Sequence, residues 1–268
     1  MNQPYVTLNN GHRIPQFGLG VFFIYDEEEC RKTCLEAFKI GYRHIDTDHG
    51  THNEKGIGRA IKESGIPREE LAVTSKLWVS DFGKDKTMKA IDDLLERLDT
   101  NYVDLLLLNQ PGPNYIDAWK ELEKAVELGK VKSIGFANFD EFDLDELLEN
   151  VTIKPAVGQI ECHPHQTKKM FRKLFKENDI TLESWFPIGH SDRKLVNEPL
   201  LQELAKKYNK SSIQIILRWH VQNGFLVFPK STKLNHIKEN FEIFDFEITP
   251  EDMEKIEGLN QNEDDYTF

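Results

Sequence analysis

The sequence predicts an α/β protein, and within that class a (β/α)8 barrel whose bottom is closed by an N-terminal β-hairpin. Short apolar segments alternate with amphipathic segments along almost the whole chain of 268 residues. Eight such repeats over about 250 residues are typical of this barrel. No linker, low-complexity segment or composition shift divides the chain. We therefore expect one barrel domain over residues 1–268.

The hairpin is expected in the opening segment VTLNNGHRIP, before the first barrel strand. Asn10-Gly11 is the turn signal, since both residues tolerate the left-handed backbone that tight hairpin turns require. A hairpin in this place would cover the end of the barrel at which the strands begin.

Eight apolar segments are candidate strands, each too short for a helix and suited to burial on both faces. They are residues 17–21, 43–46, 71–76, 103–108, 132–136, 156–160, 182–186 and 225–228. Helical periodicity appears between them at 27–41, 88–100, 116–130 and 142–150. Gly41 and Gly129 are expected to end helices, and Asp140 to begin one. A doubly wound open sheet is the alternative, but no G-x-G-x-x-G motif follows a strand.

Composition narrows the functional classes. The net charge is −12 with both signs mixed along the helices, which argues against a nucleic-acid partner. No apolar run approaches 18 residues and no signal peptide is visible, so we expect a cytoplasmic protein without a membrane partner. Three cysteines predict no disulfide framework, and no His/Cys/Asp spacing predicts a metal site. A small molecule is the expected ligand.

In such a barrel the chemistry lies where the strands end. This rule selects the following residues: Asp46, Lys76, Asn109, Asn138, Gln159 and Trp185. Asp46 and Lys76 end neighbouring strands and can meet across the mouth of the barrel. A buried salt bridge without a chemical role is the alternative interpretation of this pair.

Seven segments stand in the order of a known family: GYRHIDT, NEKGIGRAI, VTSKLW, YVDLLLL, SIGFANF, QIECHP and FPKS. With them the chain resembles the aldo/keto reductases, in particular bacterial NADP-dependent reductases of the 2,5-diketogluconate reductase and glyoxal reductase type. The resemblance implies a barrel with a bottom hairpin, NADP as cofactor and a monomer.

The resemblance also implies a catalytic tetrad of Asp, Tyr, Lys and His. Asp46 and Lys76 occupy two of these positions, but Thr51 stands where the family has tyrosine and Asn109 where it has histidine. Hydride transfer to a carbonyl needs an acid that neutralises the developing oxyanion, and an alkyl hydroxyl is a poor one. Loss of a general acid typically lowers the rate by about 10²–10⁴. We expect ordinary ketone reduction to be very poor.

The cofactor positions are better preserved in this resemblance. Trp185 corresponds to the aromatic ring that stacks on the nicotinamide, and Asn138 and Gln159 to the residues that hold its carboxamide. Lys230 and Ser231 begin the segment that holds the 2′-phosphate, with Asn240 further along. His236 replaces an arginine there, so we expect weakened NADP binding and reduced discrimination against NAD.

Other groups could carry new chemistry in such a site. Asp48 and His52 are four residues apart and would share a helical face, as a pair in which the carboxylate supports a basic histidine, or merely as a surface pair. His49 is expected to face the substrate. Lys76 could form a Schiff base if its pKa were depressed, whereas pairing with Asp46 would keep it protonated.

Several departures from the family pattern replace larger residues by small ones, at Gly50, Gly112, Ala137 and Gly158. Most of them cluster near the expected pocket, which suggests an enlarged site that has been engineered or repurposed. Three hypotheses therefore stand: a dismantled tetrad hosting other chemistry, a weak NADP-dependent reductase of aldehydes or dicarbonyls, and a non-catalytic NADP-binding protein.

Overall fold

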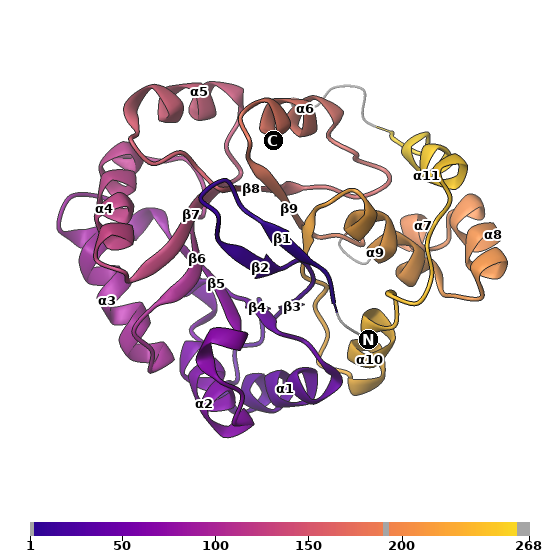
Figure 1. Ribbon diagram of the computed structural model, residues 1–268, viewed down its shortest axis with the longest axis horizontal. Coiled ribbons are helices and arrows are strands. Elements are labelled where there is room, and N and C mark those ends of the chain that lie inside the picture. The colour runs from indigo at the N-terminus through magenta and orange to yellow at the C-terminus, as the bar shows by residue number, and fades with distance from the viewer. Residues whose placement is uncertain (1–2, 190–192, 262–268) are drawn as a thin grey trace.

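The computed structural model describes residues 3–189 and 193–261. One parallel sheet holds eight strands in chain order and curls into a barrel with helices around it, as Figure 1 shows. The strands are β3 (Leu19–Gly20), β4 (His44–Asp46), β5 (Ala72–Leu77), β6 (Val103–Leu108), β7 (Val131–Ala137), β8 (Val157–Glu161), β9 (Thr181–Trp185) and β10 (Leu226–Val227). The predicted (β/α)8 barrel is confirmed.

The barrel closes between its first and last strands, which are its shortest. Parallel bridges join Phe17 to Val227 and Gly20 to Lys230. A Cβ atom at Gly20 would lie 2.7 Å from the carbonyl oxygen of Phe228, so the two backbones can approach this closely only at a glycine. At this seam β3 and β10 are shorter than the apolar segments 17–21 and 225–228 predicted.

Helices follow the strands and cover the outside of the sheet. They are α1 (Glu27–Ile40), α2 (Glu54–Ser64), α3 (Lys86–Leu98), α4 (Tyr115–Glu127), α5 (Glu141–Asn150), α6 (Lys169–Glu177), α7 (Arg193–Val196), α8 (Pro199–Tyr208), α9 (Ser212–Gln222), α10 (Leu234–Phe241) and α11 (Pro250–Glu257). Gly41 caps the end of α1, and Asp140 begins α5 by accepting a 2.8 Å hydrogen bond from the Asp143 amide. No helix among the described residues is long and apolar enough to cross a membrane.

The hairpin of β1 (Tyr5–Thr7) and β2 (Arg13–Pro15) lies across one end of the barrel (Figure 1). Its turn contains Gly11 with φ of +81°, as the Asn-Gly signal predicts. Leu8 and Ile14 are buried in one cluster with the inward-facing Leu105 and Leu107. The hairpin therefore seals the bottom of the barrel, and the mouth is left as the open end.

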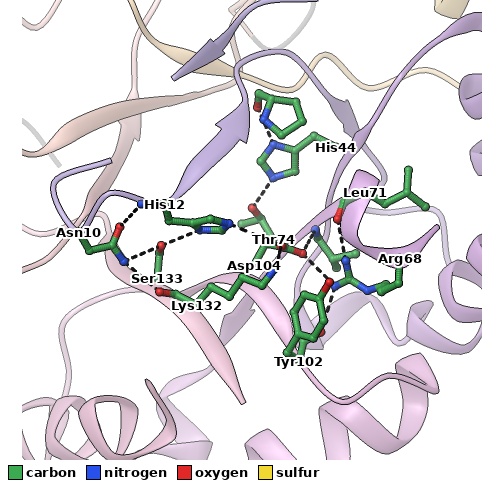
Figure 2. Close-up of polar contacts among 12 residues, drawn as sticks. Asn10, His12, His44, Arg68, Leu71, Thr74, Tyr102, Asp104, Lys132 and Ser133 are labelled. Atoms are coloured by element: carbon green, nitrogen blue, oxygen red, sulfur yellow. Dashed lines mark hydrogen bonds and ion pairs between the residues drawn. The ribbon is translucent and has the colours of Figure 1, made fainter. Parts of the chain in front are cut away.

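A second layer of polar contacts holds the hairpin against the strands, shown in Figure 2. The Asp104 carboxylate, 2% exposed, accepts hydrogen bonds from Arg68 at 2.9 Å and from Lys132 at 3.2 Å, and lies 3.8 Å from Nε2 of His12. Nδ1 of His12 shares a 2.9 Å hydrogen bond with the Ser133 hydroxyl. We call these five residues the bottom cluster; they tie the hairpin to β6 and β7.

His44 is a further buried polar group near the bottom of the barrel (Figure 2). One ring nitrogen contacts the Pro15 carbonyl and the other the Thr74 hydroxyl, each at 2.8 Å. Burial lowers the pKa of His44 to about 4, so the ring is neutral at physiological pH. Its two hydrogen bonds therefore join a neutral ring to the hairpin and to β5.

Candidate active site

A cavity of about 640 Å³ opens at the mouth of the barrel. All six residues that the strand-end rule selects line it: Asp46, Lys76, Asn109, Asn138, Gln159 and Trp185. The strands place them together because parallel strands of a barrel end at one face. The cavity is therefore the candidate active site.

Lys76 and Asp46 form a buried ion pair on neighbouring strands. The Lys76 Nζ lies 2.5 Å from Oδ1 of Asp46 and 3.1 Å from the Thr47 carbonyl oxygen. Burial lowers the pKa of Lys76, but the carboxylates of Asp46, Glu183 and Asp48 outweigh it and raise the net pKa. The lysine is held protonated, which removes the condition that Schiff-base chemistry requires.

Thr51 does not face the cavity. Its hydroxyl lies 3.2 Å from the Asp48 carboxylate and accepts a 3.3 Å hydrogen bond from the Phe23 amide, and the residue is only 1% exposed. The side chain thus holds two loops together. It has neither the reach nor the acidity to act on a ligand in the cavity.

Asp48 lines the cavity but does not pair with His52, so the predicted dyad is not formed. Asp48 begins the 3₁₀ turn His49–Thr51, and its Oδ1 accepts a 2.8 Å hydrogen bond from the Thr51 amide. His52 ends that turn in the left-handed region with φ of +54° and is exposed. The helical face that the spacing assumed does not exist, because the loop turns back before α2 begins.

His49 was expected to face the substrate, and this prediction is wrong. Its ring lies outside the cavity, where Nδ1 accepts a 2.9 Å hydrogen bond from Arg97 on α3. The buried Glu54 carboxylate, whose Oε1 lies 3.7 Å from the same nitrogen, raises the pKa of His49. The side chain therefore joins the 3₁₀ turn to α2 and α3.

Glu183 is a buried acid that the sequence analysis missed. It is fully buried on β9, and its Oε1 accepts a hydrogen bond from Gln159. Burial, reinforced by the Asp46 carboxylate, raises the pKa of Glu183 to about 8. Glu183 lies two residues before Trp185, on the same face of the strand, and this alternation could have identified it. We call Asp46, Lys76, Asp48 and Glu183 the mouth cluster.

Asn109 and Asn138 occupy the side of the cavity towards β6 and β7. The Asn138 amide donates a 3.1 Å hydrogen bond to the Asn109 carbonyl, but its buried Oδ1 has no partner among the described residues. A buried acceptor without a donor is costly unless a ligand supplies one. A carboxamide N–H would do so, and the Trp185 ring borders the same space.

A second hollow of about 560 Å³ continues from the cavity over α10. Lys230, Ser231 and His236 line both spaces, while Asn240 and Arg193 line only the second. The cations of Lys230 and Arg193 suit a phosphate, and the two hollows share part of their lining. These residues fit a nicotinamide nucleotide that lies from the mouth towards α10.

Small residues do not enlarge the cavity as the sequence suggested. A Cβ atom at Gly50 would lie 2.7 Å from the Trp78 ring, and one at Gly112 would lie 2.9 Å from Val79. At Gly158 it would lie 2.5 Å from the Phe175 ring, on the helix side of the sheet. The space at these three glycines is filled by neighbouring side chains.

Comparisons with known proteins agree with this geometry. A sequence profile of the Aldo/keto reductase family matches residues 16–261. Glyoxal reductase of Bacillus subtilis is 46% identical over 259 residues, covering 96% of this chain and 93% of that protein. Methylglyoxal reductase of Escherichia coli is 35% identical over 263 residues, covering 97% and 94%.

Solved structures of aldo/keto reductases have the same fold as this chain. The crystal structure of an aldo/keto reductase from Brucella melitensis has a TM-score of 0.93 at 43% identity, covering 97% of this chain and 100% of that one. That of a Bombyx mori aldo-keto reductase in complex with NADP has a TM-score of 0.92 at 31% identity, covering 100% and 96%. The chain belongs to the aldo/keto reductase family, whose members use NADP(H).

Proposed function

We propose that this chain binds NADP(H) at the barrel mouth and retains only slow reduction of small aldehydes or dicarbonyls, in a site that has been repurposed. One observation carries the proposal: the cavity has Lys76 and Asp46 but no tyrosine among the described residues that line it. The Thr51 hydroxyl, at the position where the resemblance expects the phenol, is turned into the loop contacts of Asp48 and Phe23.

The nucleotide part of the proposal is supported by the cavity itself. Asn138 offers an unpartnered acceptor for the carboxamide, and Trp185 a ring for stacking on the nicotinamide. Lys230 and Ser231 would hold the phosphate end of the nucleotide. His236 is an exposed imidazole, which cannot grip a 2′-phosphate with the paired donors of a guanidinium, so the preference for NADP over NAD is small.

The substrate part follows from the relatives, whose names identify glyoxal and methylglyoxal as their substrates. The nicotinamide supplies a hydride when bound. This chain then has to stabilise the developing oxyanion with the Lys76 ammonium and the Asn109 amide, both of which line the cavity. Lys76 is tightly paired with Asp46 and its raised pKa makes it a weak acid, so protonation of the oxygen limits the rate.

The test restores the missing groups. In the double variant Thr51→Tyr with Asn109→His, we expect reduction of methylglyoxal to rise by about 10²–10⁴ over the unmodified chain. The matched control is Thr51→Phe with Asn109→His, which has the same bulk without the phenolic proton. NADPH oxidation is followed by absorbance, and NADPH binding separately by fluorescence titration.

Three outcomes would contradict the proposal. They are rapid turnover by the unmodified chain, equal rates in the tyrosine and phenylalanine variants, and failure of every variant to bind NADPH. We expect the unmodified chain to bind NADPH but to turn over slowly. Only the variant with the tyrosine phenol should turn over fast.

A further inference from the structure

At the end of the cavity lined by the loops after β3, β4 and β5, the Asp48 carboxylate lies with three aromatic rings. Asp48 lines it together with Phe22, Phe23 and Trp78. Asp48 is only 3% exposed, and the two hydrogen bonds that described residues donate to its carboxylate, from the Thr51 amide and hydroxyl, reach Oδ1. No described residue donates a hydrogen bond to Oδ2, so this oxygen remains for a ligand.

The Asp48 carboxylate contributes to the raised pKa of Lys76 but lies in no ion pair with it. The Lys76 ammonium is 2.5 Å from Asp46, which takes up its charge. No described Lys, Arg or His forms an ion pair with Asp48. A ligand that is complementary to this end therefore carries a positive charge.

The rings favour the same ligand. Aromatic faces attract ammonium groups, most strongly where water is excluded, and a carboxylate among them adds direct charge attraction. The Phe23 ring already faces a cation, because the Nζ atom of Lys230 lies 5.8 Å from its centroid. The ring is thus presented to the cavity rather than packed into the core.

We propose that this end of the cavity selects small carbonyl compounds that carry an ammonium group, with the ammonium against Asp48 and the rings. The carbonyl oxygen then points to Lys76 and Asn109, which line the same cavity. The inference rests on the proposed function only in placing the carbonyl beside the nicotinamide; the ammonium site stands on Asp48 and the three rings.

The test measures binding rather than turnover. Choline and 3,3-dimethylbutan-1-ol have the same shape, but the second carries carbon in place of the charged nitrogen. We expect isothermal titration calorimetry to give choline an affinity about tenfold higher or more, with and without NADPH. In Asp48→Asn, which keeps an oxygen for the Thr51 amide, the two ligands should bind nearly equally.

The matched control is Asp26→Asn. Asp26 also caps a helix, by accepting a 2.7 Å hydrogen bond from the Glu29 amide at the start of α1, but it does not line the cavity. This variant should keep the preference for choline. A second variant, Phe22→Leu, tests the rings separately and should weaken choline binding several-fold while changing the neutral alcohol less.

Equal affinities for the two ligands, no binding of either, or a choline preference that survives in Asp48→Asn would each overturn the inference. The proposed function fails differently: the restored tyrosine variant would then reduce no carbonyl, while the choline preference would remain.

Discussion

The bottom cluster around Asp104 and the mouth cluster around Lys76 are buried in one barrel, but they are composed in opposite ways. At the bottom, a single carboxylate meets Arg68, Lys132 and His12, and it also accepts a hydrogen bond from the Val73 amide. At the mouth, the relation is reversed. One ammonium meets three acids: Asp46, Asp48 and Glu183.

The two ends of the barrel also differ in whether their buried polar atoms have hydrogen-bond partners. The Asp104 oxygens both have donors, whereas Oε2 of Glu183 and Oδ1 of Asn138 are buried at the mouth without a partner among the described residues. Folding normally pairs buried polar groups, so groups left unpaired need another explanation. The difference favours a structural role for the bottom and agrees with the ligand site proposed at the mouth.

The largest expected effect is at the bottom. Asp104 is the one acid among the described residues that pairs with Arg68 and Lys132. Asp104→Asn removes this charge and should lower the free energy of unfolding by about 2–3 kcal/mol, since those cations are partly exposed. Urea denaturation measures this change. NADPH affinity should not move. Asp92→Asn, which removes an exposed partner of Lys130, is the control and should change the stability by less than about 1 kcal/mol.

At the mouth we expect a smaller change in the free energy of unfolding, and of opposite sign. The folded-state pKa of Glu183 is about 8 against 4.5 unfolded, so the folded state holds a proton that the unfolded chain releases between these values. The stability contributed by this group therefore falls as pH rises from about 4.5 to 8. Glu183→Gln should remove this slope and raise the free energy of unfolding by about 2 kcal/mol at pH 8.

Urea denaturation at pH 6 and pH 8 measures how the free energy of unfolding changes with pH. His44 has the opposite pH dependence. Its pKa is lowered to about 4 from 6.5, so its contribution is lost as pH falls through this interval, not as it rises. An unchanged slope in Glu183→Gln would mean that this acid does not hold its proton in the folded protein.

The smallest expected effect tests the unpartnered acceptor at the mouth. Asn138 has φ of +58°, so glycine can replace it without backbone strain, whereas alanine could not. Asn138→Gly should weaken NADPH binding by about tenfold, the value of about one hydrogen bond, with little loss of stability. Fluorescence titration gives the affinity. Unchanged affinity would exclude Asn138 from the nucleotide site.

Local patterns in the sequence were sufficient for the strands, the hairpin and four of the described helices. Strand segments, the hairpin turn at Gly11 and the Asp140 cap depend on neighbours a few residues away, and these predictions are confirmed. The strand-end rule also placed Asp46 and Lys76 at one mouth, because strand order alone brings them together.

The predictions that failed concern the direction of side chains in loops. The spacing of Asp48 and His52 assumed a helix, but a 3₁₀ turn carries Asp48 inward and leaves His52 exposed. Gly50 suggested an open pocket, but the Trp78 ring from another loop fills that space. Both outcomes depend on contacts between segments that no local pattern encodes.

The sequence by itself therefore determined the barrel, its hairpin and the presence of Thr51 and Asn109 where the family resemblance implies tyrosine and histidine. Only the tertiary structure decided that Asp48 faces the cavity, that Glu183 is buried beneath it and that Thr51 is turned away. The physical reason is that burial and charge depend on what surrounds a group, and at the mouth the surroundings come from loops and strands far apart in the chain.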